Sequence, residues 1–213
     1  MAKFKSEKHK HLSVDQVQLL LNGPRMAGRE RDYYLLSLAY YLALRGGEAV
    51  VLKPEHVNLS GVEAHIPSEK RKPKRGQPVC QSTGRPMITI PILFGDSVIA
   101  GALQWAQRHP SPAGFMFPSR VDPTRPISTR QFRLTFRLWA KAAGLPEEVS
   151  AHSLRHSAGT HVYASAGAKI RASGADPLVL IRDFMRHANI ATTSIYLHSS
   201  PDTISAARKA MGG

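Results

Sequence analysis

Two arginines in this 213-residue chain have neighbours that suit them to binding a phosphate group. Arg45 follows a strongly apolar stretch and precedes Glu48 by three residues, which places the carboxylate to orient the guanidinium group. His152 and Arg155 are also three residues apart, so one helical turn would bring them to the same face. Guanidinium groups donate paired hydrogen bonds to phosphate oxygens. Taken alone, Arg45 with Glu48 is more typical of a surface ion pair, and the spacing of His152 and Arg155 occurs often by chance at the start of a helix with incidental basic residues.

Two short segments near the carboxyl end add a histidine and a tyrosine. Arg186-His187 is followed, nine residues after the histidine, by Tyr196 at the end of the segment Thr-Thr-Ser-Ile-Tyr. A tyrosine hydroxyl can act as a nucleophile, but its unperturbed pKa of about 10 means that another group must take its proton. Most tyrosines instead bury the ring and keep the hydroxyl in water. Tyr196 alone therefore does not indicate an active site.

The charge balance indicates a polyanionic partner. The chain has 29 Lys and Arg against 15 Asp and Glu, a formal net charge of +14, and a pI of about 10.3. Such a surplus favours nucleic acid, because each phosphate contact releases counterions. A basic protein with no such partner is the alternative. One predicted helix carries four cations along one face and no acid among them, which suits a DNA backbone, although solvated charged faces are common. These cations are Arg130, Arg133, Arg137 and Lys141.

The elements that must position these groups are mostly helical. Ser13 is a good N-cap for a first helix, and Ser128 with Gln131 has the pattern of a capping box before another. Alternating or β-branched residues predict two strands, over 57–67 and 87–92. The predicted class is α+β, mostly helical, with a small antiparallel sheet. The other expected helices cover 31–44, 96–108, 151–164, 178–185, 192–197 and 202–211, with one more turn over 48–52 and loops over 109–126 and 167–177.

A long basic hairpin tip is expected between the two strands, from Ser68 to Arg85. Its charge suits contact with DNA. Its cationic residues are Lys70, Arg71, Lys72, Lys74, Arg75 and Arg85.

Composition excludes several classes of protein. Hydrophobic residues are 42% of the chain, enough for a globular core. One cysteine, Cys80, allows neither a disulfide framework nor a cysteine-based zinc site, and it fits a reducing, cytoplasmic compartment. The basic residues 1–11 have no apolar segment of the kind that secretory signals contain. The apolar run from Tyr33 to Leu44 is too short to span a membrane.

Taken together, the pattern resembles the tyrosine recombinase, or phage integrase, family. The resemblance spans about Leu12 to Met211 and includes the phrases His-Ser-Leu-Arg-His-Ser and Thr-Thr-Ser-Ile-Tyr. It implies the family's catalytic fold over residues 12–213, a basic arm over 1–11, and a core-binding domain that is absent or minimal. The landmarks occur in the family's order: Arg45 with Glu48, the basic hairpin, His152-x-x-Arg155, His187 and Tyr196.

The resemblance also implies a reaction, site-specific DNA recombination by strand cleavage and rejoining. Arg45 and Arg155 would stabilise the negative charge that develops on the phosphate, and His187 would donate a further hydrogen bond. It implies no cofactor and no metal ion. Its partners would be double-stranded DNA and other copies of the chain, assembled on DNA as a tetrameric synapse, with no membrane.

The same resemblance assigns the nucleophile and the proton transfers. Tyr196 would attack phosphorus and form a 3′-phosphotyrosyl link, with His152 as the candidate base. The leaving 5′-hydroxyl would take its proton from a hairpin lysine. Lys70 matches best, and Lys72 and Lys74 are close rivals.

Three features depart from the family pattern. His187 follows His152 by 35 residues, several more than usual, with the excess near 168–176. Arg186 stands where the family usually has glycine. Only about a dozen residues precede the first predicted helix, so the chain is either a fragment or similar to the short invertases.

Other functions are also compatible with parts of the pattern. A type IB topoisomerase uses the same nucleophile without joining new partners, and a DNA-binding protein could keep the fold without the chemistry. A metal hydrolase using His152, His156 and His161 is a third alternative, although the chain lacks the H-E-x-x-H arrangement.

Overall fold

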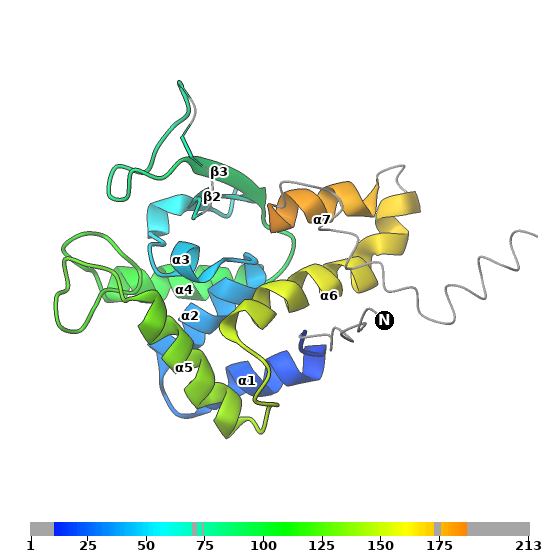
Figure 1. Ribbon diagram of the computed structural model, residues 1–213, viewed down its shortest axis with the longest axis horizontal. Coiled ribbons are helices and arrows are strands. Elements are labelled where there is room, and N and C mark those ends of the chain that lie inside the picture. Colours follow the sequence, from blue (N-terminus) through cyan, green and yellow to red (C-terminus); the bar gives the residue numbers. More distant parts are fainter. Residues whose placement is uncertain (1–10, 70–71, 74, 173–175, 187–213) are drawn as a thin grey trace, which may run out of the picture.

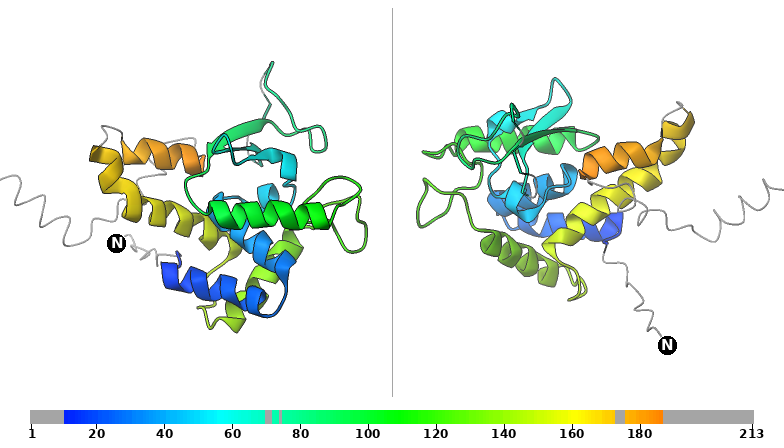
Figure 2. Two further views of the ribbon diagram at one scale, coloured as in Figure 1. Left: turned by 180° about the vertical axis from the view of Figure 1, so that it is seen from behind. Right: turned by 45° about the horizontal axis from the view of Figure 1, so that its top comes forward.

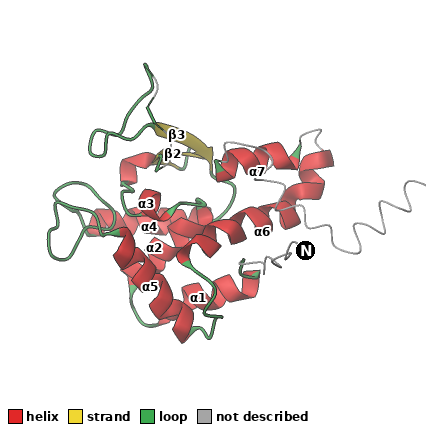
Figure 3. Ribbon diagram, viewed as in Figure 1, coloured by secondary structure: helices red, strands yellow, loops and turns green. Residues whose placement is uncertain are grey.

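The computed structural model describes residues 11–69, 72–73, 75–172 and 176–186, with the backbone alone described over 166–172. In these ranges helices dominate, and a small antiparallel sheet lies along one side (Figures 1 and 3), which confirms the predicted class. The helices are α1 (Val14–Met26), α2 (Glu30–Tyr41), α3 (Gly46–Ala49), α4 (Asp96–Arg108), α5 (Thr129–Ala142), α6 (Ala151–Ala172) and α7 (Pro177–Met185), with a short 3₁₀ helix η1 (Pro54–His56) and strands β1 (Val57–Asn58), β2 (Glu63–Pro67) and β3 (Met87–Pro91).

Helix α2 is the centre of the core. Helices α1, α4, α5 and α6 all pack against it, and α4 covers the face turned away from the viewer of Figure 1 (Figure 2). Residues 35–40 of α2 are all buried, so the prediction that this apolar helix is central is confirmed. None of the helices in the described ranges is both long and apolar enough to cross a membrane.

The carboxyl end of α2 comes three residues earlier than predicted. The Leu44 N–H donates to the Ala39 carbonyl at 2.9 Å and the Ala43 N–H to the Tyr40 carbonyl at 3.0 Å, which is a Schellman ending. Ala43 occupies its left-handed position, with φ of 45°. Glycine is usual there, and an alanine in this conformation costs about 1 kcal/mol. The Ala43 carbonyl at this turn accepts hydrogen bonds from two arginines of the site described below.

The entry into α1 is pinned to α6. Ser13 forms the expected N-cap as part of a complete capping box. The preceding residue, Leu12, is fully buried, and its N–H donates to Ser157 Oγ at 2.8 Å. His161 Nε2 donates to the Leu12 carbonyl at 2.9 Å, so His161 Nδ1 accepts from the Tyr40 hydroxyl at 2.6 Å. Burial lowers the pKa of His161, which keeps the ring neutral in this role.

The sheet has three strands where two were predicted. The first predicted strand, 57–67, is interrupted by a turn, in which Asn58 Oδ1 accepts from the Gly61 N–H at 2.9 Å and Val62 has φ of 54°. It is therefore divided into β1 and β2, which pair antiparallel, and β2 pairs in turn with β3. The strand order is β1-β2-β3, and the described part of the predicted hairpin segment projects from the β2–β3 end (Figure 1).

Helix α6 is longer than predicted. Its start at Ala151 was expected, but its backbone stays helical to Ala172, so the predicted loop over 167–177 is wrong for its first residues. The stretch contains several alanines and no proline before Pro177, which favours continuation of the helix. The first of the extra residues noted near 168–176 therefore belong to α6, which continues to Ala172. Helices α4 and α7 match their predicted ranges closely.

We expect the fold to lose stability in mild acid because of His56. This side chain is 5% exposed, its Nδ1 accepts from the Lys53 N–H at 3.2 Å, and burial lowers its pKa to about 4. Between pH 6.5 and 4 the unfolded chain therefore binds a proton that the folded chain does not, and stability falls as pH falls. From pH 7 to pH 5 the loss is about 2 kcal/mol.

The measurement is the thermal midpoint at the two pH values. His56→Asn retains an acceptor for the Lys53 N–H and removes the titration, so its midpoint should fall less between pH 7 and pH 5. An equal fall in both proteins would contradict this origin.

Candidate active site

Arg45 lies between α2 and α3, and Glu48 orients it as the sequence predicted. The Arg45 N–H donates to Glu48 Oε2 at 2.8 Å, and Arg45 Nη1 donates to Glu48 Oε1 at 3.0 Å. The Glu48 side chain is fully buried, whereas the Arg45 side chain is 14% exposed. A buried carboxylate thus fixes one edge of the guanidinium group and leaves part of the arginine accessible.

His152 and Arg155 both lie near the start of α6, but only Arg155 is enclosed. Arg155 is 1% exposed, and its Nη1 donates to the Ala43 carbonyl at 2.6 Å. His152 is exposed, and its ring lies edge-on to that of His156, with centroids 4.6 Å apart. Arg155 is therefore anchored to the turn after α2, which also leads into Arg45.

Arg186 lies with Arg45, Glu48 and Arg155, and these four residues form the arginine cluster. Position 186 was not among the predicted site residues. Arg186 Nη2 lies 2.7 Å from Glu48 Oε2, and the two side chains are 2% and 0% exposed. The same nitrogen donates to the Ala43 carbonyl at 2.6 Å, and the Arg186 carbonyl accepts from Arg45 Nη2 at 3.4 Å. The sequence feature that could have indicated a role for Arg186 was a charged residue at the end of an apolar helix, at a position where the family usually has glycine.

The electrostatics of the cluster favour a bound anion. Burial by itself raises the pKa of the Glu48 carboxyl, but Arg186, the Arg45 N–H, Arg45 and Arg155 together hold it below its ordinary value. Glu48 is thus ionised, and its single negative charge is shared by three guanidinium groups. Among the described members of the cluster this leaves a surplus of positive charge, which a phosphate group would offset.

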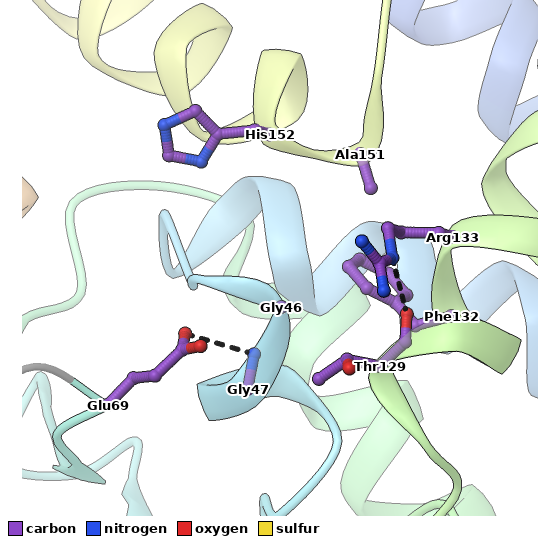
Figure 4. A pocket seen from close by; sticks show the side chains of 8 residues that line it. All are labelled: Gly46, Gly47, Glu69, Thr129, Phe132, Arg133, Ala151 and His152. Atoms are coloured by element: carbon purple, nitrogen blue, oxygen red, sulfur yellow. Dashed lines mark hydrogen bonds between the residues drawn. The ribbon is translucent and has the colours of Figure 1, made fainter.

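A pocket of about 200 Å³ adjoins the cluster (Figure 4). It is bordered by the start of α3, by α5 and by the start of α6. Figure 4 shows His152 on one side of it and the Glu69 carboxylate on another, with Glu69 Oε2 accepting from the Gly47 N–H at 3.2 Å. An anionic oxygen is therefore already accommodated at this edge. The lining residues are Gly46, Gly47, Glu69, Thr129, Phe132, Arg133, Ala151 and His152.

The predicted basic stripe on α5 lies beside the pocket. Arg130, Arg133 and Arg137 are exposed, and Arg133 also lines the pocket, with its Nε donating to the Thr129 carbonyl at 3.3 Å. Ser128 caps the start of the helix, and its side chain accepts from the Gln131 N–H at 3.1 Å, the first half of the expected capping box. The stripe therefore extends the positive surface away from the cluster.

The hairpin segment is tied to α3 by a residue with no predicted site role. Arg85 Nη1 donates to the Gly47 carbonyl at 2.7 Å. Lys72 and Arg75 are exposed, as expected for a DNA-contacting tip. Lys70 and Lys74 lie outside the described residues, so the structure does not test which lysine approaches the cluster.

His187 and Tyr196 also lie outside the described residues, together with the predicted helices over 192–197 and 202–211 and the basic arm through residue 10. The chain is nevertheless described up to Arg186, the residue before His187. Since the Arg186 carbonyl contacts Arg45, the backbone that leads into His187 lies against the cluster.

The histidines do not gather as the metal-hydrolase alternative requires. Both ring nitrogens of His161 are engaged, by Tyr40 and by the Leu12 carbonyl, while His152 is exposed at the start of the same helix. Among the described side chains, no three of His, Cys, Asp or Glu are grouped so that they could hold a metal ion.

Comparison with known protein families gives a match over most of the chain. The model of the phage integrase family matches residues 10–202. A tyrosine recombinase of Pseudothermotoga lettingae is 27% identical over 169 residues, 79% of this chain and 50% of that protein. The tyrosine recombinase XerC of Escherichia coli is 28% identical over 196 residues, 89% of this chain and 56% of XerC. The chain thus spans about half the length of these relatives.

Solved structures share the fold. The crystal structure of XerA recombinase aligns with a TM-score of 0.66 at 21% identity, over 94% of this chain and 64% of that one. The integrase of transposon Tn1549, solved with transposon right end DNA, aligns with a TM-score of 0.68 at 16% identity, over 100% of this chain and 69% of that one. A lambda integrase dimer bound to a core site is a third match, with a TM-score of 0.61.

Proposed function

Because this chain belongs to the phage integrase family of tyrosine recombinases, we propose that it cuts and rejoins double-stranded DNA at specific sites through a covalent link to Tyr196. The observation that carries the proposal is that Arg45 and Arg155 meet at one buried carboxylate: Arg45 donates to Glu48, and Arg155, which donates to the Ala43 carbonyl, is close enough to lower the pKa of Glu48. These arginines are 110 residues apart, and both match the family's landmarks. Neither the surface ion pair nor the basic helix start considered above would require such an arrangement.

The arginines would act on the phosphate. A phosphodiester under attack spreads negative charge over its non-bridging oxygens, and preorganised guanidinium groups stabilise that charge. Arg45 is partly exposed while one edge is held by Glu48, and Arg155 is held by the Ala43 carbonyl, so both are oriented before DNA arrives. In the proposal, His187 adds a further hydrogen bond.

The bond changes are balanced without an external energy source. The Tyr196 oxygen would form a bond to phosphorus as the bond between phosphorus and the 5′-oxygen breaks, giving a 3′-phosphotyrosyl link. His152, exposed at the pocket, would take the proton of the tyrosine hydroxyl, and Lys70 would give a proton to the 5′-oxygen, with Lys72 and Lys74 as its rivals. Attack by a 5′-hydroxyl on the phosphotyrosine then reverses these steps and rejoins the strand.

Binding to DNA would rely on the α5 stripe and the hairpin tip. Residues 12–213 would form the catalytic domain, and several copies would assemble on the DNA, up to a tetrameric synapse. That the Tn1549 integrase was solved with DNA and the lambda integrase as a DNA-bound dimer supports this part of the proposal.

Neutralising the α5 stripe is expected to weaken DNA binding in a salt-dependent way. When three arginines are replaced by glutamine, the slope of log affinity against log salt should become shallower by about 2 to 3, because each phosphate contact contributes about 0.9. The measurement is fluorescence anisotropy of a labelled duplex over a salt series. An unchanged slope would remove the stripe from the interface. The test variant carries Arg130→Gln, Arg133→Gln and Arg137→Gln, and the matched control carries Arg25→Gln, Arg29→Gln and Arg108→Gln, at three exposed positions on other elements.

The proposed function is tested by trapping the covalent intermediate. Duplexes from DNA flanking the coding sequence, each with a nick beside the candidate cleavage point, release a short strand after cleavage and prevent rejoining. A protein–DNA adduct that survives denaturation is the expected result, and it should form in excess EDTA. Transfer of the trapped strand to a second duplex would distinguish recombination from relaxation by a topoisomerase.

A further inference from the structure

The residue that follows helix α7, Arg186, has a backbone conformation that arginine does not favour. Arg186 has φ of 54° and ψ of 41°, in the left-handed region where glycine is the usual residue. Helices α1 and α5 end in the usual way, with Gly28 at φ of 65° and Gly144 at φ of 64°. An arginine in this position strains the backbone, and such strain persists only where the surrounding contacts hold the residue in place.

The Arg186 side chain joins three elements: α3, the turn after α2, and α7. Its guanidinium group bonds to Glu48 of α3, to the Ala43 and Leu42 carbonyls after α2 at 2.6 and 3.3 Å, and to the Phe184 carbonyl of its own helix at 3.2 Å. Such a set of donors needs the planar fork of an arginine and is beyond an ammonium group. The end of α7 is thereby fixed against the end of α2.

Both arginines that would bind the phosphate depend on groups that Arg186 also holds. Arg45 shares the Glu48 carboxylate with Arg186 and donates to the Arg186 carbonyl. Arg155 shares the Ala43 carbonyl, at the same distance of 2.6 Å. Removing the Arg186 guanidinium would take away one hydrogen-bond partner of Glu48 and one of the Ala43 carbonyl, and the turn after α2 could then relax.

We infer that Arg186 is a positioning residue of the active site, which locks Glu48 and the Ala43 carbonyl so that Arg45 and Arg155 are held ready for a phosphate. The inference rests on the proposed function, since the phosphate is the scissile one. It also links the docking of α7, the helix before His187, to the geometry of both arginines. Where the family usually has glycine, which adopts this turn without strain, the chain has an arginine whose backbone is strained and whose side chain anchors α7.

The test uses Arg186→Gly, which removes the anchor while restoring a residue suited to the backbone. Adduct formation in a single turnover at saturating nicked DNA should slow by roughly 10- to 100-fold, as for other groups that orient a catalytic residue, while half-saturation changes less than about threefold. Millimolar guanidinium ion should restore part of the rate. The rate of adduct formation in Arg186→Lys should lie between the rates of the unaltered chain and of Arg186→Gly, because lysine keeps a charge near Glu48. Arg182→Gln is the control, a change at a half-buried position of the same helix whose side chain pairs with Asp183.

A readout without DNA separates this inference from the proposed function. Nitrogen-15 NMR of the arginine side chains should show the Arg45 and Arg155 guanidinium signals as sharp and slowly exchanging in the unaltered chain, and broadened in Arg186→Gly. Sharp signals in the variant would overturn the positioning role, whether or not the chain forms an adduct. Broadened signals with no adduct from the unaltered chain would support the anchor and reject the recombinase reaction. An adduct rate unaffected by Arg186→Gly would also overturn the inference.

Discussion

Replacing Arg45 with lysine is expected to slow adduct formation by roughly 10²- to 10³-fold, the usual effect of removing one preorganised donor from a developing negative charge. Lysine keeps the positive charge and can still pair with Glu48, so the electrostatic attraction for DNA changes little. It loses the planar pair of donors, one edge of which is held by Glu48 in the chain as it stands. The effect should therefore fall on the rate at saturation rather than on affinity.

Arg45 suits this test better than Arg155, because its side chain is 14% exposed whereas Arg155 is 1% exposed. A lysine at position 155 would be buried, and loss of the fold could imitate loss of catalysis. Circular dichroism melts of Arg45→Lys should show a midpoint close to that of the unaltered chain. The matched control is Arg108→Lys, an exposed change on α4. If Arg45→Lys cleaves at the unaltered rate, Arg45 does not contact the scissile phosphate.

Local patterns were sufficient to predict much of the helical framework. Ser13 and Ser128 are N-caps as expected, since capping depends on residues within one turn of each other. The range of α4 was predicted in full, because an apolar period and flanking breakers identify it without reference to the rest of the fold. The same reasoning placed Arg45 beside Glu48, three residues away.

The errors fall where tertiary structure decides. Helix α2 ends at a Schellman turn with alanine at the left-handed position, where sequence rules expect glycine. The early strand was divided by a turn around Asn58, and α6 continued through a stretch that resembled a loop. Arg186 could not be placed from the sequence, because its partner Glu48 is 138 residues away and the pairing exists only once α7 has docked. The sequence pattern predicts a role for Arg45 and Arg155 at a phosphate, and the fold shows which groups hold the two side chains.

The largest expected effect is the loss of adduct in Tyr196→Phe. Phenylalanine keeps the ring and removes the one oxygen that would bond to phosphorus, so adduct formation should fall by at least about 10⁴-fold, as when other enzymes lose their nucleophile. Affinity for the nicked duplex should stay within about threefold, since the hydroxyl is not needed for backbone contacts. Peptide mapping of the adduct from the unaltered chain should place the DNA on Tyr196.

The Tyr196→Phe experiment tests the choice of nucleophile separately from the family match, although both come from the same sequence pattern. The spacing of nine residues from His187 indicates Tyr196, and the hydrogen bond from Arg45 Nη2 to the Arg186 carbonyl supports a nucleophile supplied by the segment that follows. An adduct that persists in Tyr196→Phe would mean that another residue attacks while the arginine cluster still serves the phosphate. Binding without any adduct from the unaltered chain would favour a DNA-binding protein that keeps the cluster as a phosphate clamp. In that case Arg45→Lys should weaken binding itself, since no later step would remain for the donors to accelerate.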